Sequence, residues 1–395
     1  MTKSTVRILS LIMAFFLLPF SAVTAYAGQG DTVVTAASVD DPIPFDLDCI
    51  SAVLMEAETG TVLYNKNGSE ALPPASVTKI MTLLLVMEAI DTGRLKLNDT
   101  LQVSEYAASM GGSQVYLEPG EEISVEDLIK SVVIASANDA AVTLAEAVAG
   151  SETGFITMMN ERAKSLGMSN TNFENATGLD DTAVNHVTSA IDIAIMSRKL
   201  ISHPLILNYS SIWMDSIRNG AFGLTNTNRL VRFYNGATGL KTGSTSKAKF
   251  CISATAKRDG MHLIAVIMGA PTRDIRNEAA KKLLDHGFAN YSIYRDPAKM
   301  IGNVKMLRGV DGFCPVSHAS FSALLPKGSS SKVSVITEIP GELTAPVREG
   351  DVIGKIVYSA DGKTIGSVDV VCSADVDAIG FFGLLKRMLS SFLLS

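Results

Sequence analysis

Ser76 and Lys79 stand three residues apart at the start of a long apolar run, in the stretch PPASVTKI (73–80). On one helix face, β-carbons three residues apart are about 5–6 Å from each other. A serine hydroxyl needs a base within hydrogen-bond reach to act as a nucleophile at neutral pH. A lysine can be that base only if its pKa falls well below about 10.4, through burial or a nearby cation. The pair therefore predicts nucleophilic catalysis if the rest of the chain meets these conditions.

Two further stretches offer polar partners for this pair. Ser136-Ala137-Asn138 interrupts an Ala-rich helical stretch that begins at Ser124, where Asp127 three residues later completes a capping pattern. Polar residues inside such a stretch are unexpected unless they have a function. Lys241, in GLKTGST on an expected strand, is a candidate for the second cation, and Gly243 is expected to let the backbone of a substrate approach the strand edge closely.

The surrounding pattern predicts how these residues are positioned. Residues 49–68 read as a β-hairpin, the run after Ser76 as a helix buried on every side, and residues 152–166 and 186–201 as further helices. Strands are expected within 238–260 and 261–271, followed by a helix over 272–291. This order predicts an α/β (α+β) domain, residues 48–291, whose antiparallel sheet is assembled from both ends and flanked by a helical block. Short strands and turns then predict a small all-β domain over 292–375.

The two ends of the chain have patterns that are typical of export and of membrane attachment. Lys3 and Arg7 precede an apolar stretch from Ile8 to about Val23, and Ala25-Tyr26-Ala27 follows it as a cleavage site. This pattern predicts a secretory signal peptide over residues 1–27; an uncleaved anchor is the alternative. Residues 28–47 suit a linker. Over 376–395, apolar residues recur at helical spacing opposite Lys386 and Arg387, which predicts an amphipathic helix lying in a membrane interface. A helix docked on the protein's own surface is the alternative.

Composition excludes several classes of function. The chain has 395 residues, 47% of them hydrophobic, and a formal charge of −6, so a folded protein is expected and nucleic acid is not an expected partner. The five histidines and four cysteines show no metal-ligand spacing, so neither a metal nor another cofactor is expected. Cys314 and Cys372 are candidates for a disulfide in an exported protein, and buried free thiols are the alternative.

Taken together and in order, SVTK (76–79), SAN (136–138) and KTG (241–243) resemble the three active-site motifs of the penicillin-binding protein and β-lactamase superfamily. The flanking stretches GGSQVYLEPGE (111–121), NFENATGLDD (172–181) and TNTNRLV (225–231) resemble the low-molecular-weight D-alanyl-D-alanine carboxypeptidases. Residues 345–371 resemble the C-terminal domain of that family, and the amphipathic tail resembles its membrane anchor. The resemblance covers nearly all of the mature chain.

The resemblance implies a role for each residue. Ser76 is the acylated nucleophile, Lys79 its general base, and Ser136 relays a proton to the departing D-alanine amine. Asn138 binds the substrate amide and holds Lys79, while Lys241 and Thr242 bind the terminal carboxylate. Gly243 and Ser244 complete the substrate-binding strand, and the backbone N–H groups of Ser76 and Ser244 form the oxyanion hole.

The implied substrate is a peptidoglycan stem peptide ending in D-Ala-D-Ala, and β-lactam antibiotics are implied covalent inhibitors. The implied location is the outer face of the bacterial cytoplasmic membrane. Two alternatives remain: a β-lactamase, with Glu174 activating the deacylating water, and a catalytically idle cell-wall binding protein. The first lacks the Glu-x-x-Leu-Asn pattern, and the second does not need three complete motifs. His186 is expected to cap or pack rather than to react.

Overall fold

The computed structural model describes residues 46–393, so the expected signal peptide and nearly all of the expected linker lie outside the described residues. The helices are η1 (Ala75–Thr78), α1 (Lys79–Asp91), α2 (Glu105–Ala108), α3 (Val125–Ile134), α4 (Asn138–Ala149), α5 (Glu152–Ser165), α6 (Ala190–Ile201), α7 (Pro204–Ser210), α8 (Leu230–Phe233), α9 (Arg273–Asn290), η2 (Ser330–Lys332) and α10 (Phe381–Leu393). The strands up to residue 270 are β1 (Ser51–Glu56), β2 (Val62–Lys66), β3 (Thr100–Gln102), β4 (Glu122–Ser124), β5 (Met214–Ile217), β6 (Phe222–Thr225), β7 (Ala237–Thr245), β8 (Lys249–Arg258) and β9 (Met261–Ala270).

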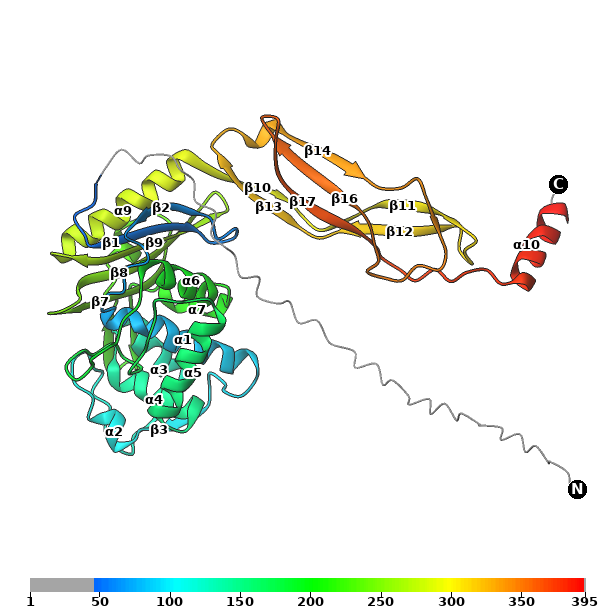
Figure 1. Ribbon diagram of the computed structural model, residues 1–395. Coiled ribbons are helices and arrows are strands. Elements are labelled where there is room, and N and C mark those ends of the chain that lie inside the picture. The colour runs from blue at the N-terminus through cyan, green and yellow to red at the C-terminus, as the bar shows by residue number, and fades with distance from the viewer. Residues whose placement is uncertain (1–45, 394–395) are drawn as a thin grey trace, which may run out of the picture. The chain divides into compact units, whose positions relative to one another are not determined.

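A five-stranded sheet in the order β2-β1-β9-β8-β7 organises the first domain (Figure 1). Every neighbouring pair of its strands is antiparallel. The predicted hairpin is present as β1 and β2, and β1 pairs with β9 from the other end of the domain. The expectation of an antiparallel sheet assembled from both ends of the domain is therefore confirmed.

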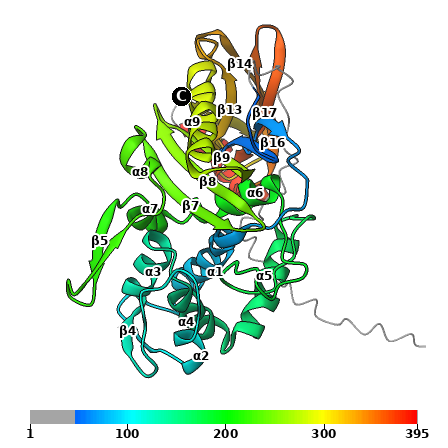
Figure 2. The same ribbon diagram turned by 90° about the vertical axis from the view of Figure 1, so that its left-hand side faces the viewer.

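Side chains alternate between the two faces of this sheet, as the period of a strand requires. Ala52 and Leu54 join a core formed with α9, whereas Val53 and Met55 join the core of the helical block. Figures 1 and 2 show the same division, with α9 on one side of the sheet and α1, α3, α4 and α6 on the other. The domain thus has a layer of helices on each face of the sheet.

Helix α1 lies at the centre of the helical block, and it is buried almost all round as predicted. The predicted cap of α3 is confirmed, since the side chain of Ser124 accepts a hydrogen bond from Asp127 N. Helix α6 begins at Ala190 rather than at residue 186, because the residues just before it form extended bridges to neighbouring segments and Ser189 then caps the helix.

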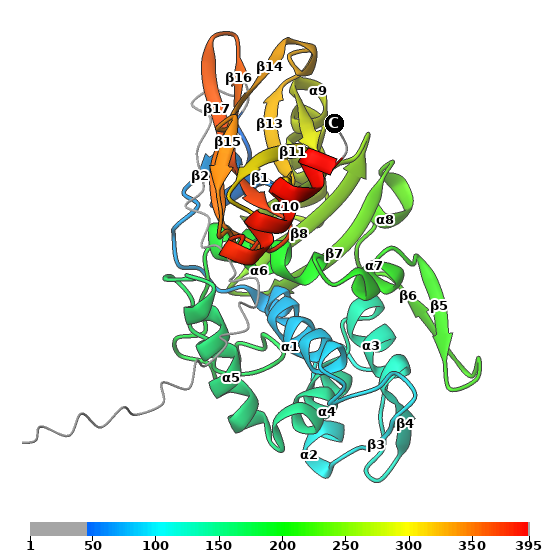
Figure 3. The ribbon, with the colours of Figure 1, turned by 90° about the vertical axis from the view of Figure 1, so that its right-hand side faces the viewer.

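The C-terminal residues form a separate set of strands, whose bounds are β10 (Tyr291–Asp296), β11 (Lys299–Leu307), β12 (Phe313–His318), β13 (Phe321–Pro326), β14 (Val333–Glu338), β15 (Glu342–Thr344), β16 (Val352–Ala360) and β17 (Lys363–Cys372). Six of them form a sheet in the order β14-β16-β17-β12-β11-β15, and Figure 3 labels five of the six. The strands β10 and β13 form a separate pair (Figure 1). The expected C-terminal all-β domain is confirmed. Cys314 and Cys372 are buried free thiols in its core rather than a disulfide.

The terminal helix is shorter than the expected span of 376–395. Val376 forms a bridge with Val347 and is only 2% exposed, so it belongs to the core of the β domain. Helix α10 begins at Phe381. Within residues 46–393 no helix is both long and apolar enough to cross a bilayer.

Candidate active site

Ser76 lies in the short 3₁₀ turn η1, and Lys79 is the first residue of α1. The sequence had placed both residues on one regular helix, so the tighter turn under Ser76 is a correction. In a 3₁₀ turn the side chains of residues three apart eclipse each other. Lys79 Nζ accordingly lies 3.1 Å from Ser76 Oγ.

Two carbonyl oxygens complete the surroundings of the Lys79 amine. Nζ lies 2.5 Å from Asn138 Oδ1 and 2.7 Å from the backbone oxygen of Thr177. Neither oxygen can donate a hydrogen, so each accepts one from the amine. A neutral amine has two hydrogens and one lone pair, and both hydrogens are then committed. The lone pair of neutral Lys79 is left for the hydroxyl hydrogen of Ser76, which is the geometry of a general base.

Burial favours the neutral form of this amine. Lys79 is 0% exposed, and burial lowers its pKa well below the usual value, with the Lys241 cation as the second cause and Asp139 as an opposing one. A lysine base needs a dry environment and a second cation nearby. Lys79 has both. The apolar helix α1 supplies much of the dry wall.

Ser136 lies in the break between α3 and α4, in a left-handed conformation with φ 64°. Such a conformation is unusual for a residue with a β-carbon, and strained residues gather at functional sites. Ser136 Oγ accepts a hydrogen bond of 2.8 Å from Lys241 Nζ, which also donates to the backbone oxygen of Thr242. Burial and the nearby Arg276 lower the pKa of Lys241 to about 7. The second and third motifs therefore meet through one hydrogen bond.

Gly243 has a different neighbour from the one that the sequence suggested. A β-carbon at this position would lie 2.8 Å from Ser76 N and 2.9 Å from Val77 N, so the turn η1 itself requires the glycine. Strand β7 is the last strand of its sheet, which leaves Ser244 at an open edge beside Ser76. Thr242 Oγ1 donates to Thr227 Oγ1 in the TNTN segment, which fixes the Thr242 side chain.

A cavity of about 460 Å³ opens at these residues. Its lining includes Ser76, Ser136, Thr242, Gly243, Ser244 and Arg276, and none of the described residues that line it is acidic. Arg276, which the sequence analysis missed, is 3% exposed and donates to Asn277 Oδ1 and to the backbone oxygen of Cys251. A buried guanidinium held only by neutral acceptors is costly, and it favours an anionic ligand. No sequence signal separates Arg276 from Arg273, the other arginine of its helix.

The loop over residues 172–188 supplies the carbonyl of Thr177 and packs against η1, the turn that contains Ser76. A β-carbon at Gly178, where φ is +82°, would lie 1.9 Å from the backbone oxygen of Ala75. Thr82 Oγ1 of α1 donates to the backbone oxygen of Ala176 in the same loop. This contact of Thr177 was not predicted from the sequence, because a backbone carbonyl contact leaves no mark on the side-chain pattern.

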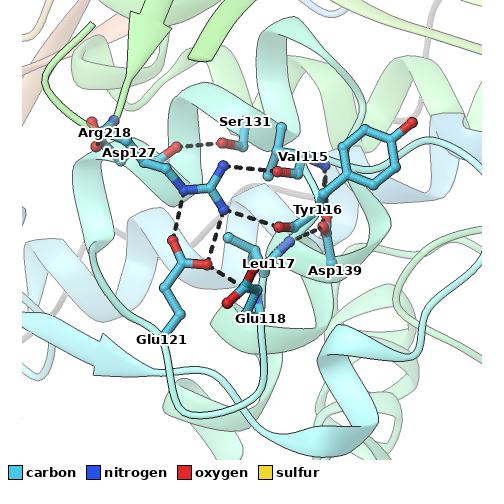
Figure 4. A network of polar contacts seen from close by, with 9 residues as sticks. All are labelled: Val115, Tyr116, Leu117, Glu118, Glu121, Asp127, Ser131, Asp139 and Arg218. Carbon is cyan, nitrogen blue, oxygen red and sulfur yellow. Dashed lines mark hydrogen bonds and ion pairs between the residues drawn. The ribbon is translucent and has the colours of Figure 1, made fainter. Parts of the chain in front are cut away.

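A second loop, residues 111–121, is held beside the site by two charged side chains (Figure 4). Asp139, next to Asn138 in the chain, accepts hydrogen bonds from the backbone N–H groups of Val115 and Leu117. Arg218 donates to the backbone oxygen of Val115 and to both carboxylate oxygens of Glu121.

The same loop contacts Asn138 directly. Its Gly111 oxygen accepts from Asn138 Nδ2 at 2.6 Å, and its Ser113 oxygen accepts from Asn138 N at 2.7 Å. The network around Asp139 and Arg218 therefore fixes the loop that orients Asn138.

Comparison with known proteins agrees with this geometry. Residues 35–272 match the family model described as D-alanyl-D-alanine carboxypeptidase, and residues 315–378 match that of the penicillin-binding protein 5 C-terminal domain. The chain is 42% identical to D-alanyl-D-alanine carboxypeptidase DacF of Bacillus subtilis, over 87% of this chain and 89% of that protein. It is 34% identical to DacC of Escherichia coli, over 92% and 90% of the two chains.

Solved structures give the same result for the fold. Penicillin-binding protein 5 from Haemophilus influenzae superposes with a TM-score of 0.75 at 32% identity, covering 85% of this chain and all of that one. Penicillin-binding protein D2 from Listeria monocytogenes, in its ampicillin-bound form, superposes with a TM-score of 0.55 at 36% identity, covering 62% of this chain and all of that one.

Proposed function

The chain belongs to the D-alanyl-D-alanine carboxypeptidase family, and from this membership we propose a role for each residue of the site. The reaction removes the terminal D-alanine from a peptidoglycan stem peptide that ends in D-Ala-D-Ala. The observation that carries the assignment is the environment of Lys79 Nζ, whose two carbonyl partners leave the lone pair facing Ser76 Oγ.

Acylation begins at the carbonyl carbon between the two D-alanines. Ser76 Oγ attacks this carbon while its proton passes to Lys79 Nζ, and the carbonyl oxygen becomes an oxyanion. The N–H groups of Ser76 and Ser244 donate to this oxyanion; the close approach of β7 to η1 at Gly243 supports that arrangement. Such donors are typically worth about 3–4 kcal/mol each in the transition state.

The leaving amine needs a proton when the C–N bond breaks. Ser136 Oγ–H gives its proton to this nitrogen and takes one back from the Lys79 ammonium, which makes Lys79 neutral again before deacylation. Its hydrogen bond to Lys241 and its place on the cavity wall support this relay. Water then attacks the acyl-enzyme, Lys79 takes a proton from this water, and it returns the proton to Ser76 Oγ as the ester bond breaks.

The terminal carboxylate of the substrate binds at the cationic side of the cavity. Lys241 and Thr242 hold it, as the resemblance implies, and Arg276 joins them. The supporting observation is that the buried Lys241 and Arg276 side chains have neutral hydrogen-bond partners and that no acidic residue lines the described cavity. An incoming carboxylate compensates both charges, which favours peptides with a free C-terminus.

β-Lactams resemble the D-Ala-D-Ala terminus and acylate Ser76, and their adduct hydrolyses slowly. A rapid β-lactamase would need a further base at the acyl-enzyme. The candidate, Glu174, instead accepts hydrogen bonds from the backbone N–H groups of Val184 and Asn185, and it is not part of the cavity lining. These contacts favour the carboxypeptidase over the β-lactamase.

The protein acts outside the cytoplasm, at the outer face of the cytoplasmic membrane, and attaches there through α10. The expected signal peptide and the peptidoglycan substrate of the family support export. Phe381 and Phe382 of α10 are 75% and 83% exposed, so their apolar rings are free to enter a membrane interface, and the same helix carries the basic residues Lys386 and Arg387.

Two measurements test the catalytic assignment. Purified protein should release D-alanine from diacetyl-L-lysyl-D-alanyl-D-alanine, and no release by folded protein would overturn the proposal. A labelled penicillin should add its mass to the chain at Ser76 and persist; the adduct should be lost in Ser76→Ala and kept in Ser69→Ala, an exposed serine away from the cavity. Turnover within seconds would indicate a β-lactamase, and no adduct at all would indicate an idle binding protein.

A further inference from the structure

His186 is a buried imidazole that the mechanism above does not use. We propose that it is a positioning residue, whose ring fastens the nucleophile turn η1 to the loop over residues 172–188 and so keeps the Thr177 carbonyl on Lys79. The proposal rests on the proposed function of Ser76 and Lys79. It goes beyond the capping or packing role that the sequence suggested for this residue.

The hydrogen bonds of the ring fix its tautomer. Glu174 N donates to His186 Nδ1 at 2.9 Å, so Nδ1 carries the lone pair. In a neutral imidazole Nε2 then carries the hydrogen, and it donates to Thr78 Oγ1 at 2.8 Å. Both ring nitrogens are therefore used, one for the loop and the other for the nucleophile turn.

These two bonds join the segments that form the base site. Thr78 lies between Ser76 and Lys79 in sequence, and Glu174 lies in the same loop as Thr177. A shift of that loop relative to η1 would move the Thr177 oxygen away from Lys79 Nζ, which it now meets at 2.7 Å. The amine would then lose one of the two acceptors that direct its lone pair toward the serine.

The packing around the ring supports a clamp of fixed geometry. His186 is 5% exposed and packs edge-on against Phe173, with ring centroids 5.7 Å apart. The loop and the turn touch again at Gly178, which leaves no room for a β-carbon beside Ala75. His186 does not line the cavity, so it acts through its neighbours rather than on the substrate.

Three substitutions separate the two bonds. In His186→Asn, the side-chain oxygen can replace Nδ1 as the acceptor from Glu174 N; in His186→Gln, the amide nitrogen can replace Nε2 as the donor to Thr78. His186→Phe keeps the aromatic packing and loses both bonds. We expect His186→Phe to slow acylation by labelled penicillin and kcat for the tripeptide by about 10- to 100-fold, the range for a misplaced catalytic group. The Asn and Gln variants should lose less, and KM should change less than twofold in all three.

The matched control is His262, a second largely buried histidine, whose Nε2 contacts Thr238 Oγ1 at 2.9 Å away from the nucleophile turn. His262→Gln should leave the acylation rate within twofold of the wild type. Thr78→Val, which keeps the shape of the threonine and removes its hydroxyl, should slow acylation as His186→Asn does. Its effect should not add to that of His186→Phe.

Several outcomes would overturn the proposal. The first is a wild-type acylation rate in folded His186→Phe. The second is an equal loss of acylation rate in all three His186 variants, which would indicate packing alone. The third is a change confined to KM. If His186→Phe does not fold, Thr78→Val decides the matter, since wild-type acylation by that variant contradicts the clamp. D-Alanine release by the unaltered protein is measured first, so failure of the proposed function is seen separately.

Discussion

Lys79 Nζ and Ser76 Oγ lie 3.1 Å apart, with the amine buried and its two other partners both carbonyl oxygens. This relationship supports the proposed roles of Ser76 as the nucleophile and Lys79 as its base. It depends on three segments that are distant in sequence, namely the break before α4, the loop over residues 172–188 and strand β7.

Removing the Lys241 cation should shift the pH dependence of acylation. Lys241 is a cause of the lowered pKa of Lys79, so in Lys241→Gln that pKa should rise. The base is active only when neutral, so the acid limb of the rate of acylation by labelled penicillin should move to higher pH. The control is Lys282→Gln, which removes an exposed lysine, and the acid limb of its acylation rate should stay at the wild-type pH. A limb at the same pH in Lys241→Gln would contradict this electrostatic link.

Gly178→Ala should be much more damaging than Gly120→Ala. The two glycines have φ of +82° and +81°, so an alanine meets the same backbone strain at both positions, about 1 kcal/mol. Only at Gly178 does the new β-carbon meet another atom, the Ala75 oxygen at 1.9 Å, whereas nothing lies within 4 Å at Gly120. We expect an additional loss of about 1–3 kcal/mol in urea unfolding, together with slower acylation. Equal losses would mean that the loop and the turn are not in close contact.

Arg218→Met should loosen the loop over residues 111–121. The substitution removes donors to Glu121 and to two backbone oxygens, and charged hydrogen bonds are worth about 1.5–3 kcal/mol each before compensation. We expect a loss of about 2 kcal/mol in the free energy of unfolding, non-additive with Glu121→Gln in a double-mutant cycle. Arg94→Met, at an exposed arginine, should cost less than about 0.5 kcal/mol. Additive losses of unfolding free energy at Arg218 and Glu121 would show that the two side chains do not stabilise the loop through their mutual contact.

Stability should fall in acid through the buried histidines. Burial lowers the pKa of His186 and of His262 to about 4 in the folded protein, against about 6.5 when unfolded. The unfolded chain therefore binds more protons between these values, and stability is lost as pH falls from about 6.5 to about 4, by up to about 3 kcal/mol for each group. Urea unfolding at several pH values should give a shallower acid slope in His262→Gln than in the wild type. An unchanged slope would show that His262 does not take part.

Truncation after Gly380 should release the protein from membranes. This cut removes α10 and leaves Val376 in the core of the β domain, so folding should be kept. We expect the shortened protein in the soluble fraction with an unchanged rate of D-alanine release, and the intact protein bound to anionic vesicles. Continued sedimentation with membranes, or a large loss of stability on truncation, would indicate instead a helix docked on the protein's own surface.

The sequence by itself determined the chemistry of this protein and much of its fold. SVTK, SAN and KTG predict the reacting groups by type, because a serine nucleophile needs a base, and a lysine base needs a dry environment and a nearby cation. Alternation and helical periodicity predicted the hairpin, the buried helix after Lys79 and the sheet built from both ends, since these patterns express which side chains are buried.

Only the tertiary structure decided how the groups meet. The carbonyl of Thr177, the buried Arg276 and the His186 bridge come from segments far from Ser76 in sequence, and a backbone oxygen or a single arginine has no periodic signature. The same holds for Gly243, whose crowding by η1 exists only once β7 lies beside that turn. Local propensity determines where helices and strands form. The direction of the Lys79 lone pair depends instead on contacts between segments that only the folded chain brings together.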